Sequence, residues 1–227
     1  MSTATTLEAA PMAGVIERTL GELARDIPGA TAVFRRHRLD FCCGGGATLR
    51  DAAQARGVDA DAVCSELATL SPQPASPLPQ RPAELTQFIV QRFHDVHRRE
   101  LPELVRLAEK VERVHREHPE VPAGLADHLR GMHEELLQHM EKEETILFPM
   151  MAQEPPMPLR PPIQRMREEH VDHGEALQRI QALTHELREP ADACNTWASL
   201  YAGLRKLCDD LVEHIHIENN LLFPRFE

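Results

Sequence analysis

Two short motifs in the second half of the chain pair histidine with glutamate at helical spacing. His139 and Glu143 form one H-x3-E motif, and His214 and Glu218 form the other, 75 residues further along. Each motif is followed by aliphatic residues and then by Phe-Pro. Residues four apart lie on one face of an α-helix, with Cβ atoms about 5–6 Å apart. Each motif therefore predicts an imidazole and a carboxylate that project side by side.

A second, weaker repeat has nearly the same offset. His94 begins the sequence HDVH and His170 begins HVDH, 76 residues later. Two independent motifs that repeat at almost one offset indicate two related helix pairs. In a helix bundle such a repeat gives approximate two-fold symmetry, so equivalent residues are expected to face each other across the core.

These residue types at these positions predict a metal site. Both motifs lie on or beside apolar stripes, where an unpaired carboxylate is costly and a cation compensates its charge. Imidazole suits iron, zinc, copper and nickel, and a carboxylate can bridge two ions. Six donors are too many for one tetrahedral zinc. We therefore predict two octahedral ions, with open positions for chemistry or a small ligand, bridged by the two glutamates and held by His94, His139, Glu143, His170, His214 and Glu218.

Less specific interpretations compete with this one. A helical chain with 13 histidines contains some exposed H-x3-E pairs by chance, and either motif alone fits that interpretation better. The repetition in register favours the metal site. His97 and His173 follow two of the predicted ligands by three residues and could chelate, but a surface or neighbouring role is more typical of such histidines. Glu135, one turn before His139, could hydrogen-bond a ligand imidazole.

Four long helices are expected to position these residues. Their patterns span residues 83–115, 122–150, 161–187 and 193–222, joined by short proline-rich or polar connections, which favours an antiparallel four-helix bundle in an all-α fold. Pro102 lies inside the first helix and should bend or divide it.

Ahead of the bundle, the sequence predicts a separate small module. Residues 71–82 are proline-rich and read as a semi-rigid linker, so the division is 1–70, 71–82 and 83–227. The first part reads as four short helices. Within it, Cys42 and Cys43 precede three glycines, and adjacent cysteines do not easily form a mutual disulfide. The pair could serve iron or cluster transfer, redox sensing or an intermolecular bridge in a homodimer; alternatively, only the glycine turn matters.

The composition narrows the class of protein. A net charge of −11 argues against non-specific nucleic-acid binding and against docking on anionic lipid. No stretch of about 18 apolar residues is present, so no membrane span is expected, and the N-terminus does not resemble a signal peptide. Five cysteines, two of them adjacent, indicate a reducing compartment, and we expect a cytoplasmic protein.

Two parts of the chain resemble known families. The segments HEELLQHMEKEETILFPM and DDLVEHIHIENNLLFPR are similar to hemerythrin-like domains, and LDFCCGG at residues 39–45 resembles the N-terminal module of iron-sulfur cluster repair proteins, the RIC or ScdA/YtfE group. The order of the two modules also fits that group. The resemblance implies a non-haem, carboxylate-bridged pair of iron ions on the same six residues.

The resemblance further implies repair of iron-sulfur clusters damaged by nitric oxide or peroxide. Damaged cluster proteins and the small ligands NO, O2 and peroxide would be the partners, and the chain would be an iron donor or repair protein rather than a turnover enzyme. Hemerythrins that carry oxygen use an additional histidine without a secure equivalent here, which disfavours simple O2 carriage. Two alternatives remain: an O2 or NO sensor or store, and a di-iron oxidase or peroxidase.

Overall fold

The structure is a computed structural model that describes residues 12–70, 78–153 and 158–227, and these residues form two compact units. Within these ranges every regular element is helical and no β-strand occurs. The all-α fold class expected from the sequence is therefore confirmed. No helix in the described ranges is both long enough and apolar enough to cross a membrane.

The smaller unit contains five short helices: α1 (Met12–Ile16), α2 (Leu20–Asp26), α3 (Ala30–Arg36), α4 (Leu49–Arg56) and α5 (Ala60–Thr69). Thr19 and Glu22 form a capping box at the start of α2, and Thr48 caps α4. Gly57, with φ of 65°, ends α4 in the left-handed conformation that favours glycine. Helices α2 to α5 match the four predicted segments, whereas α1 was not predicted.

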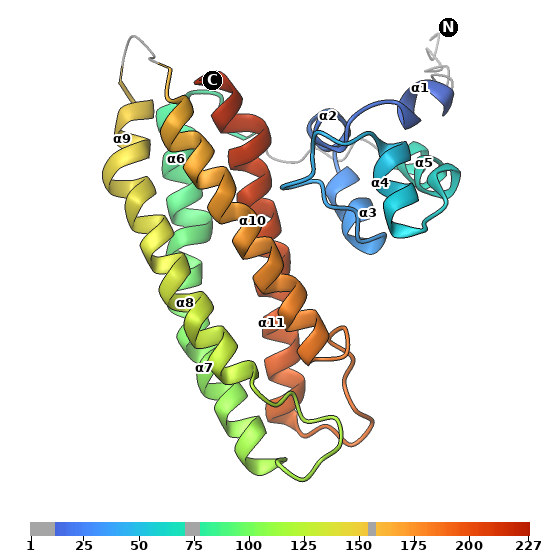
Figure 1. The fold of residues 1–227 in the computed structure, drawn as a ribbon, viewed down its shortest axis with the longest axis vertical. Helices are drawn as coiled ribbons and strands as arrows, with labels where there is room; N and C mark the ends of the chain where they lie inside the picture. Colours follow the sequence, from blue (N-terminus) through green and yellow to red (C-terminus); the bar gives the residue numbers. More distant parts are fainter. Residues whose placement is uncertain (1–11, 71–77, 154–157) are drawn as a thin grey trace, which may run out of the picture. The chain divides into compact units, whose positions relative to one another are not determined.

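The larger unit is the four-helix bundle (Figure 1). Its first rod is α6 (Pro82–Ile89), η1 (Val90–His94) and α7 (Asp95–Val114). The second is α8 (Leu125–Lys142), η2 (Glu143–Leu147) and α9 (Phe148–Met151). The third is α10 (Arg160–Leu183), and the fourth is α11 (Asn195–Ile217) with η3 (Glu218–Leu222) and η4 (Phe223–Arg225). Most of the predicted linker, residues 71–77, lies outside the described residues, and Pro82 already belongs to a helix.

The four rods form a closed ring in which each contacts two neighbours. Helix α7 packs against α8 and α11, and α10 packs against the same two helices. The rods alternate in direction along the chain, so α7 and α10 run one way while α8 and α11 run the other (Figure 1). The interior is filled by apolar side chains that are fully buried, including Leu101, Leu129, Leu136, Ile180, Leu200, Leu204 and Leu211.

Three π-helical turns interrupt the bundle, and each contains a predicted ligand. They are η1, which ends at His94, η2, which begins at Glu143, and η3, which begins at Glu218. A π turn adds one residue to a helical turn and re-aims the side chains beside it, and such turns are frequent at functional sites. The division expected at Pro102 is wrong, because α7 continues through that residue and the irregular turn lies at η1.

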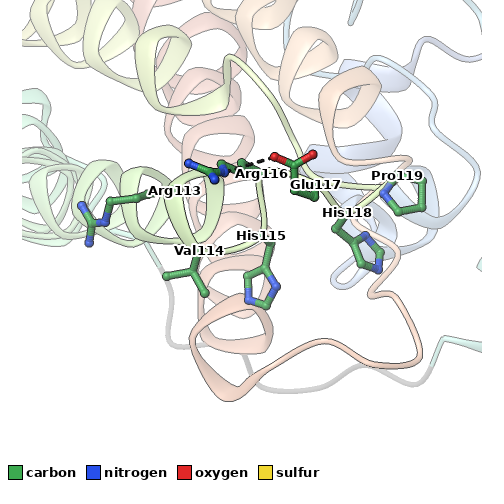
Figure 2. A pocket seen from close by; sticks show the side chains of 7 residues that line it. All are labelled: Arg113, Val114, His115, Arg116, Glu117, His118 and Pro119. Atoms are coloured by element: carbon green, nitrogen blue, oxygen red, sulfur yellow. Dashed lines mark hydrogen bonds and ion pairs between the residues drawn. The ribbon is translucent and has the colours of Figure 1, made fainter.

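The connection after α7 borders an open hollow of about 670 Å³. Its lining comes from one continuous stretch, residues 113–119, which includes His115 and His118 (Figure 2). At 1.5 Å per helical residue, the hollow begins roughly 30 Å along α7 from His94. It is therefore separate from the residues predicted to bind metal.

Candidate di-metal site

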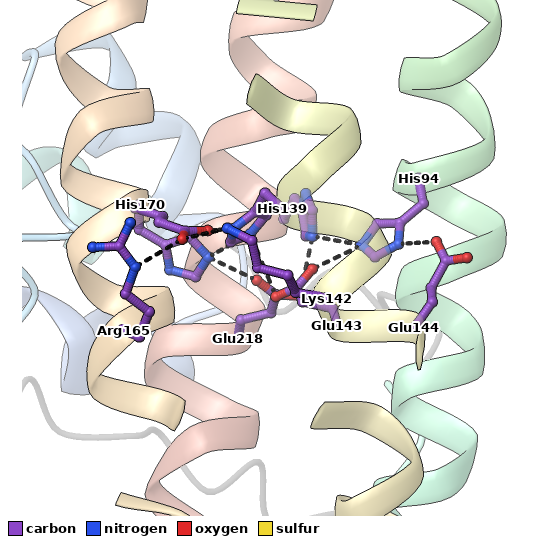
Figure 3. Close-up of polar contacts among 10 residues, drawn as sticks. His94, His139, Lys142, Glu143, Glu144, Arg165, His170 and Glu218 are labelled. Atoms are coloured by element: carbon purple, nitrogen blue, oxygen red, sulfur yellow. Dashed lines mark hydrogen bonds and ion pairs between the residues drawn. The ribbon is translucent and has the colours of Figure 1, made fainter. Parts of the chain in front are cut away.

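The structure brings all six predicted residues together inside the bundle. The four Nε2 atoms point inward in two pairs: His94 and His214 are 3.0 Å apart at these atoms, and His139 and His170 are 3.2 Å apart. All six side chains are fully or almost fully buried. Figure 3 shows His94, His139 and His170 converging on Glu143 and Glu218. The six form two donor groups with ligand atoms within 4.8 Å of one another.

The two donor groups share both glutamates. We call His94, His214 and the glutamates the 94/214 group, and His139, His170 and the glutamates the 139/170 group. Glu143 places Oε2 at 3.3 Å from His94 Nε2 and Oε1 at 3.4 Å from His139 Nε2.

Glu218 repeats this arrangement on the opposite helix. Its Oε1 lies 3.1 Å from His214 Nε2, and its Oε2 lies 3.0 Å from His170 Nε2. Each carboxylate thus offers one oxygen to each pair of imidazoles, which is the arrangement needed to bridge two cations.

Hydrogen bonds on the outer side of two rings determine which nitrogen carries the proton. His94 Nδ1 lies 2.7 Å from Glu144 Oε1, and His139 Nδ1 lies 2.9 Å from Glu169 Oε2. A carboxylate can only accept, so in the neutral ring Nδ1 donates and Nε2 keeps its lone pair. These two imidazoles therefore present metal-binding lone pairs to the centre, as ligating histidines do.

Cationic side chains in turn hold the two outer carboxylates. Glu144 Oε1 contacts Arg98 at 2.8 Å. Glu169 Oε1 contacts Lys142 Nζ at 2.6 Å and Arg165 Nε at 2.9 Å. The hydrogen bond to His139 outweighs burial, and with Lys142 it lowers the pKa of Glu169 to about 2. The outer carboxylates therefore remain ionised at neutral pH.

The unsatisfied polar atoms show that the donor set fits cations. Among the described residues, four buried side-chain atoms at the centre have no hydrogen-bond partner: both carboxylate oxygens of Glu143, Oε2 of Glu218 and Nδ1 of His214. A buried carboxylate without such bonds is costly unless a cation compensates it. Burial lowers the pKa of His94, but the adjacent carboxylates of Glu143 and Glu144 raise it to about 9. The centre thus attracts positive charge, which a metal ion supplies without protonating its ligands.

Aromatic rings fix two of the imidazoles at equivalent places in the repeat. Phe148 stacks on His94 with ring centroids 5.8 Å apart, and Phe223 stacks on His170 at the same distance. These are the phenylalanines of the two Phe-Pro sequences, so each ring packs on the histidine of the first helix in its own helix pair. This contact explains why the phenylalanine recurs in both motifs.

The sequence analysis missed two residues and misplaced a third. Glu144 and Glu169 hydrogen-bond the ligand rings, whereas Glu135, expected in that role, is exposed. Glu144 directly follows Glu143, and Glu169 directly precedes His170. Periodicity could not identify them, because adjacent residues on a helix point in different directions and meet partners on other helices. Their position beside a ligand is the only signal in the sequence.

His97 and His173 are buried rather than exposed, at 1% and 3% of their surface. Burial, followed by repulsion from His214 and His94, lowers the pKa of His97 to about 3. Burial, followed by repulsion from His139 and His170, does the same to the pKa of His173. Both imidazoles are therefore neutral neighbours of the centre.

In the smaller unit, the thiols of Cys42 and Cys43 lie 3.7 Å apart and are not joined by a disulfide. Asp40 Oδ1 accepts a hydrogen bond from the Cys43 amide and lies 3.3 Å from Cys42 Sγ. The contact with Cys43 and then burial raise the pKa of the Cys42 thiol, which is itself buried. Asp40, Cys42 and Cys43 form a further cluster of metal-ligating types.

Family models match both parts of the chain. The hemerythrin HHE cation binding domain matches residues 87–226, and ScdA_N, described as a domain of unknown function, matches residues 16–71. The iron-sulfur cluster repair protein YtfE of Dickeya chrysanthemi is 51% identical over 212 residues, which cover 92% of this chain and 96% of that protein. The chain belongs to the YtfE family of iron-sulfur cluster repair proteins.

Further YtfE proteins agree with this assignment. That of Musicola paradisiaca is 51% identical over 212 residues, and that of Escherichia coli O81 is 47% identical over 215, each with 92% of this chain and 96% of the relative covered. The family resemblance inferred from the sequence is confirmed. The bundle of this YtfE family member is a hemerythrin-type cation-binding domain, and its two buried donor groups indicate a di-metal site.

Proposed function

We propose that the chain takes part in the repair of iron-sulfur clusters damaged by nitrosative or oxidative stress, and that it uses two non-haem iron ions. Membership of the YtfE family supports the process, since its relatives are named for it. The observation that carries the metal assignment is the sharing of Glu143 and Glu218 between two pairs of buried imidazoles.

The proposed ligands divide into two sets. His94 and His214 would hold one ion, His139 and His170 would hold the other, and the two glutamates would bridge them. Two imidazoles with carboxylate oxygens and open positions suit non-haem iron. When bound, the iron pair supplies exchangeable metal and open positions for NO, O2 or peroxide.

The surrounding side chains hold this centre ready for metal. Glu144 and Glu169 keep a proton on Nδ1 of His94 and His139, so that Nε2 stays free to bind. Arg98 and Lys142 offset the negative charge of these carboxylates near the bundle surface. The apolar interior excludes water from the remaining sides, which strengthens the interaction of a cation with both glutamates.

The small module is proposed to assist the transfer. In this scheme residues 1–70 form a thiol-bearing module, residues 71–82 a linker and residues 83–227 the di-iron bundle. The support for a thiol role is the cluster formed by Asp40, Cys42 and Cys43. Damaged cluster proteins would be the recipients, in the cytoplasm, and a Cys43 bridge between two chains is the proposed route to a homodimer.

A metal and repair assay on anaerobically purified protein tests the proposal. We expect two irons per chain with the Mössbauer signature of a coupled pair, and recovery of a peroxide-damaged [4Fe–4S] dehydratase when the loaded protein is added. Glu143→Ala should abolish both, whereas Glu135→Ala on the same helix should change neither. Equal repair by Glu143→Ala would refute the proposal. O2 consumption with turnover would favour the oxidase alternative, and a stable stoichiometric adduct without repair would favour the sensor.

A further inference from the structure

His97 and His173 occupy equivalent places in the internal repeat. Each follows a predicted ligand by three residues on its own helix, and they are 76 residues apart, as His94 and His170 are. They lie about 4.5 Å further along α7 and α10 than those ligands. The repeat thus places a second histidine beside each donor group.

The two histidines lie on the side of the centre opposite the glutamates. Glu143 and Glu218 come one turn after His139 and His214, at the starts of η2 and η3. These turns continue α8 and α11, which run in the opposite direction to α7 and α10 (Figure 1). Moving forward along α7 or α10 therefore leads away from the carboxylates. The layer of ligand imidazoles has carboxylates on one side and His97 and His173 on the other.

The rings of both histidines are close to ligand rings. His173 meets His139 edge to face, with ring centroids 4.9 Å apart. His97 lies 5.7 Å from His214 between ring centroids. One additional imidazole is therefore adjacent to the 139/170 group and one to the 94/214 group.

Both rings are buried with polar atoms left unsatisfied. Within the described ranges, both ring nitrogens of His173 and Nε2 of His97 lack a hydrogen-bond partner. A buried donor or acceptor without a partner loses its hydrogen bonds to water and gains none in return, so it destabilises the fold. A phenylalanine or leucine would fill the same space without that cost. The ring nitrogens therefore indicate a hydrogen-bond partner at the centre.

The donor count indicates where that partner binds. Each ion would receive two imidazole nitrogens and one oxygen from each glutamate, which leaves an octahedral ion with open positions. The carboxylates lie on one side of the imidazole layer, and the unsatisfied ring nitrogens of His97 and His173 lie on the other. Neither residue belongs to the two donor groups, so each would contact a ligand of the ions rather than bind an ion itself.

We propose that His97 and His173 form a binding site for a small anion with nitrogen or oxygen acceptors, on the side of the di-metal centre opposite the glutamates. Each imidazole donates one N–H to the anion, and the pair selects ligands that reach both donor groups. This inference rests on the proposed di-iron function, because the ions anchor the ligand.

Azide titration of the full-length, iron-loaded protein tests this role. Azide binding is followed by the charge-transfer absorption of its ferric complex. We expect His97→Phe and His173→Phe each to weaken azide binding about tenfold, as loss of one hydrogen bond to a charged ligand predicts. His173→Gln retains a donor and should stay within about threefold of the wild type. The control is His133→Phe, the same substitution at a half-buried histidine on a different helix, α8, and it should not change azide affinity.

Iron content separates the outcomes. If the Phe variants keep both ions and bind azide as the wild type does, the two histidines are packing residues and the inference is wrong. If either variant loses one ion, that histidine is a direct ligand, which also overturns the inference. If the wild type itself does not hold two ions, the proposed function fails, and that result is visible before any azide is added. Where a Phe variant does not fold, the comparison of His173→Gln with His173→Ala replaces it.

Discussion

The two donor groups come from one internal repeat, yet the protein supports their histidines differently. In the 139/170 group, His139 is hydrogen-bonded to Glu169, which Lys142 and Arg165 hold in turn. The equivalent ring in the 94/214 group, His214, instead stacks on Phe93, with centroids 5.3 Å apart and planes 6° apart. Phe93 and Glu169 are the equivalent residues of the two repeats, each preceding a ligand histidine.

This difference means that one histidine is oriented by charge and the other by packing. A carboxylate partner fixes the tautomer and raises the basicity of a ligand imidazole, whereas a stacked ring restrains only its orientation. The backbone is unequal as well, because the π turn that ends at His94 has no counterpart in α10. We infer that the two ions differ in affinity, and the following predictions test that difference.

Removing a shared glutamate should have the largest effect. Glu143→Ala takes one oxygen from each donor group, so we expect both ions to be lost, as measured by iron content. The metal-free variant should unfold no more easily than metal-free wild type, because a buried carboxylate without hydrogen bonds is gone. Retention of one ion would show that Glu143 serves a single group.

Removing one histidine should break only its own group. For His214→Ala we expect about half the iron of the wild type and loss of the Mössbauer signature of a coupled pair, because the 139/170 group keeps its four donors. His170→Ala should also keep about half of the iron, because in this variant the 94/214 group keeps its four donors. Loss of all iron in both variants would mean that the groups bind only together.

Glu169→Leu should weaken the 139/170 group while leaving its ligands in place. Loss of such a partner typically costs about 10–100-fold in metal affinity. In a chelator competition we expect one of the two ions to be released at correspondingly lower chelator concentration. Glu169→Gln can still accept a hydrogen bond from His139 but lacks the charge, so its metal affinity should lie between those of the wild type and Glu169→Leu. An equal shift for both ions would contradict the separate support described above.

Glu144→Leu should act in the same way on the 94/214 group, with a smaller effect. The side chain of Glu144 is 27% exposed against 8% for Glu169, so solvent screens it more. We expect a loss of affinity below that of Glu169→Leu in the same competition assay. A larger loss would reverse the ranking of the two carboxylates.

Phe93→Leu should give the smallest change. The variant removes the ring that stacks on His214, and such a pair contributes about 0.5–1.5 kcal/mol beyond burial. Denaturant unfolding of the metal-free protein should show a loss of about that size, and release of one ion should become faster. Phe223→Leu, beside His170, is the matched variant for the other group. Release of the same ion in both variants would show that the rings do not act locally.

The sequence by itself determined the four-helix bundle and the six residues that meet inside it. This was possible because helical spacing places residues four apart on one face, and because a repeated motif identifies equivalent helices. The α1 helix was missed since it spans only five residues, and Pro102 does not divide its helix because α7 continues through it.

Only the tertiary structure decided how the six residues divide into groups and which neighbours support them. The assignment of His94 to His214, and of His139 to His170, depends on which helices are adjacent. Glu144 and Glu169 act across to other helices, and the burial of His97 and His173 depends on what packs over them. Spacing within one helix specifies which side chains share a face, but partners on different helices are set by packing, which a single sequence does not encode locally.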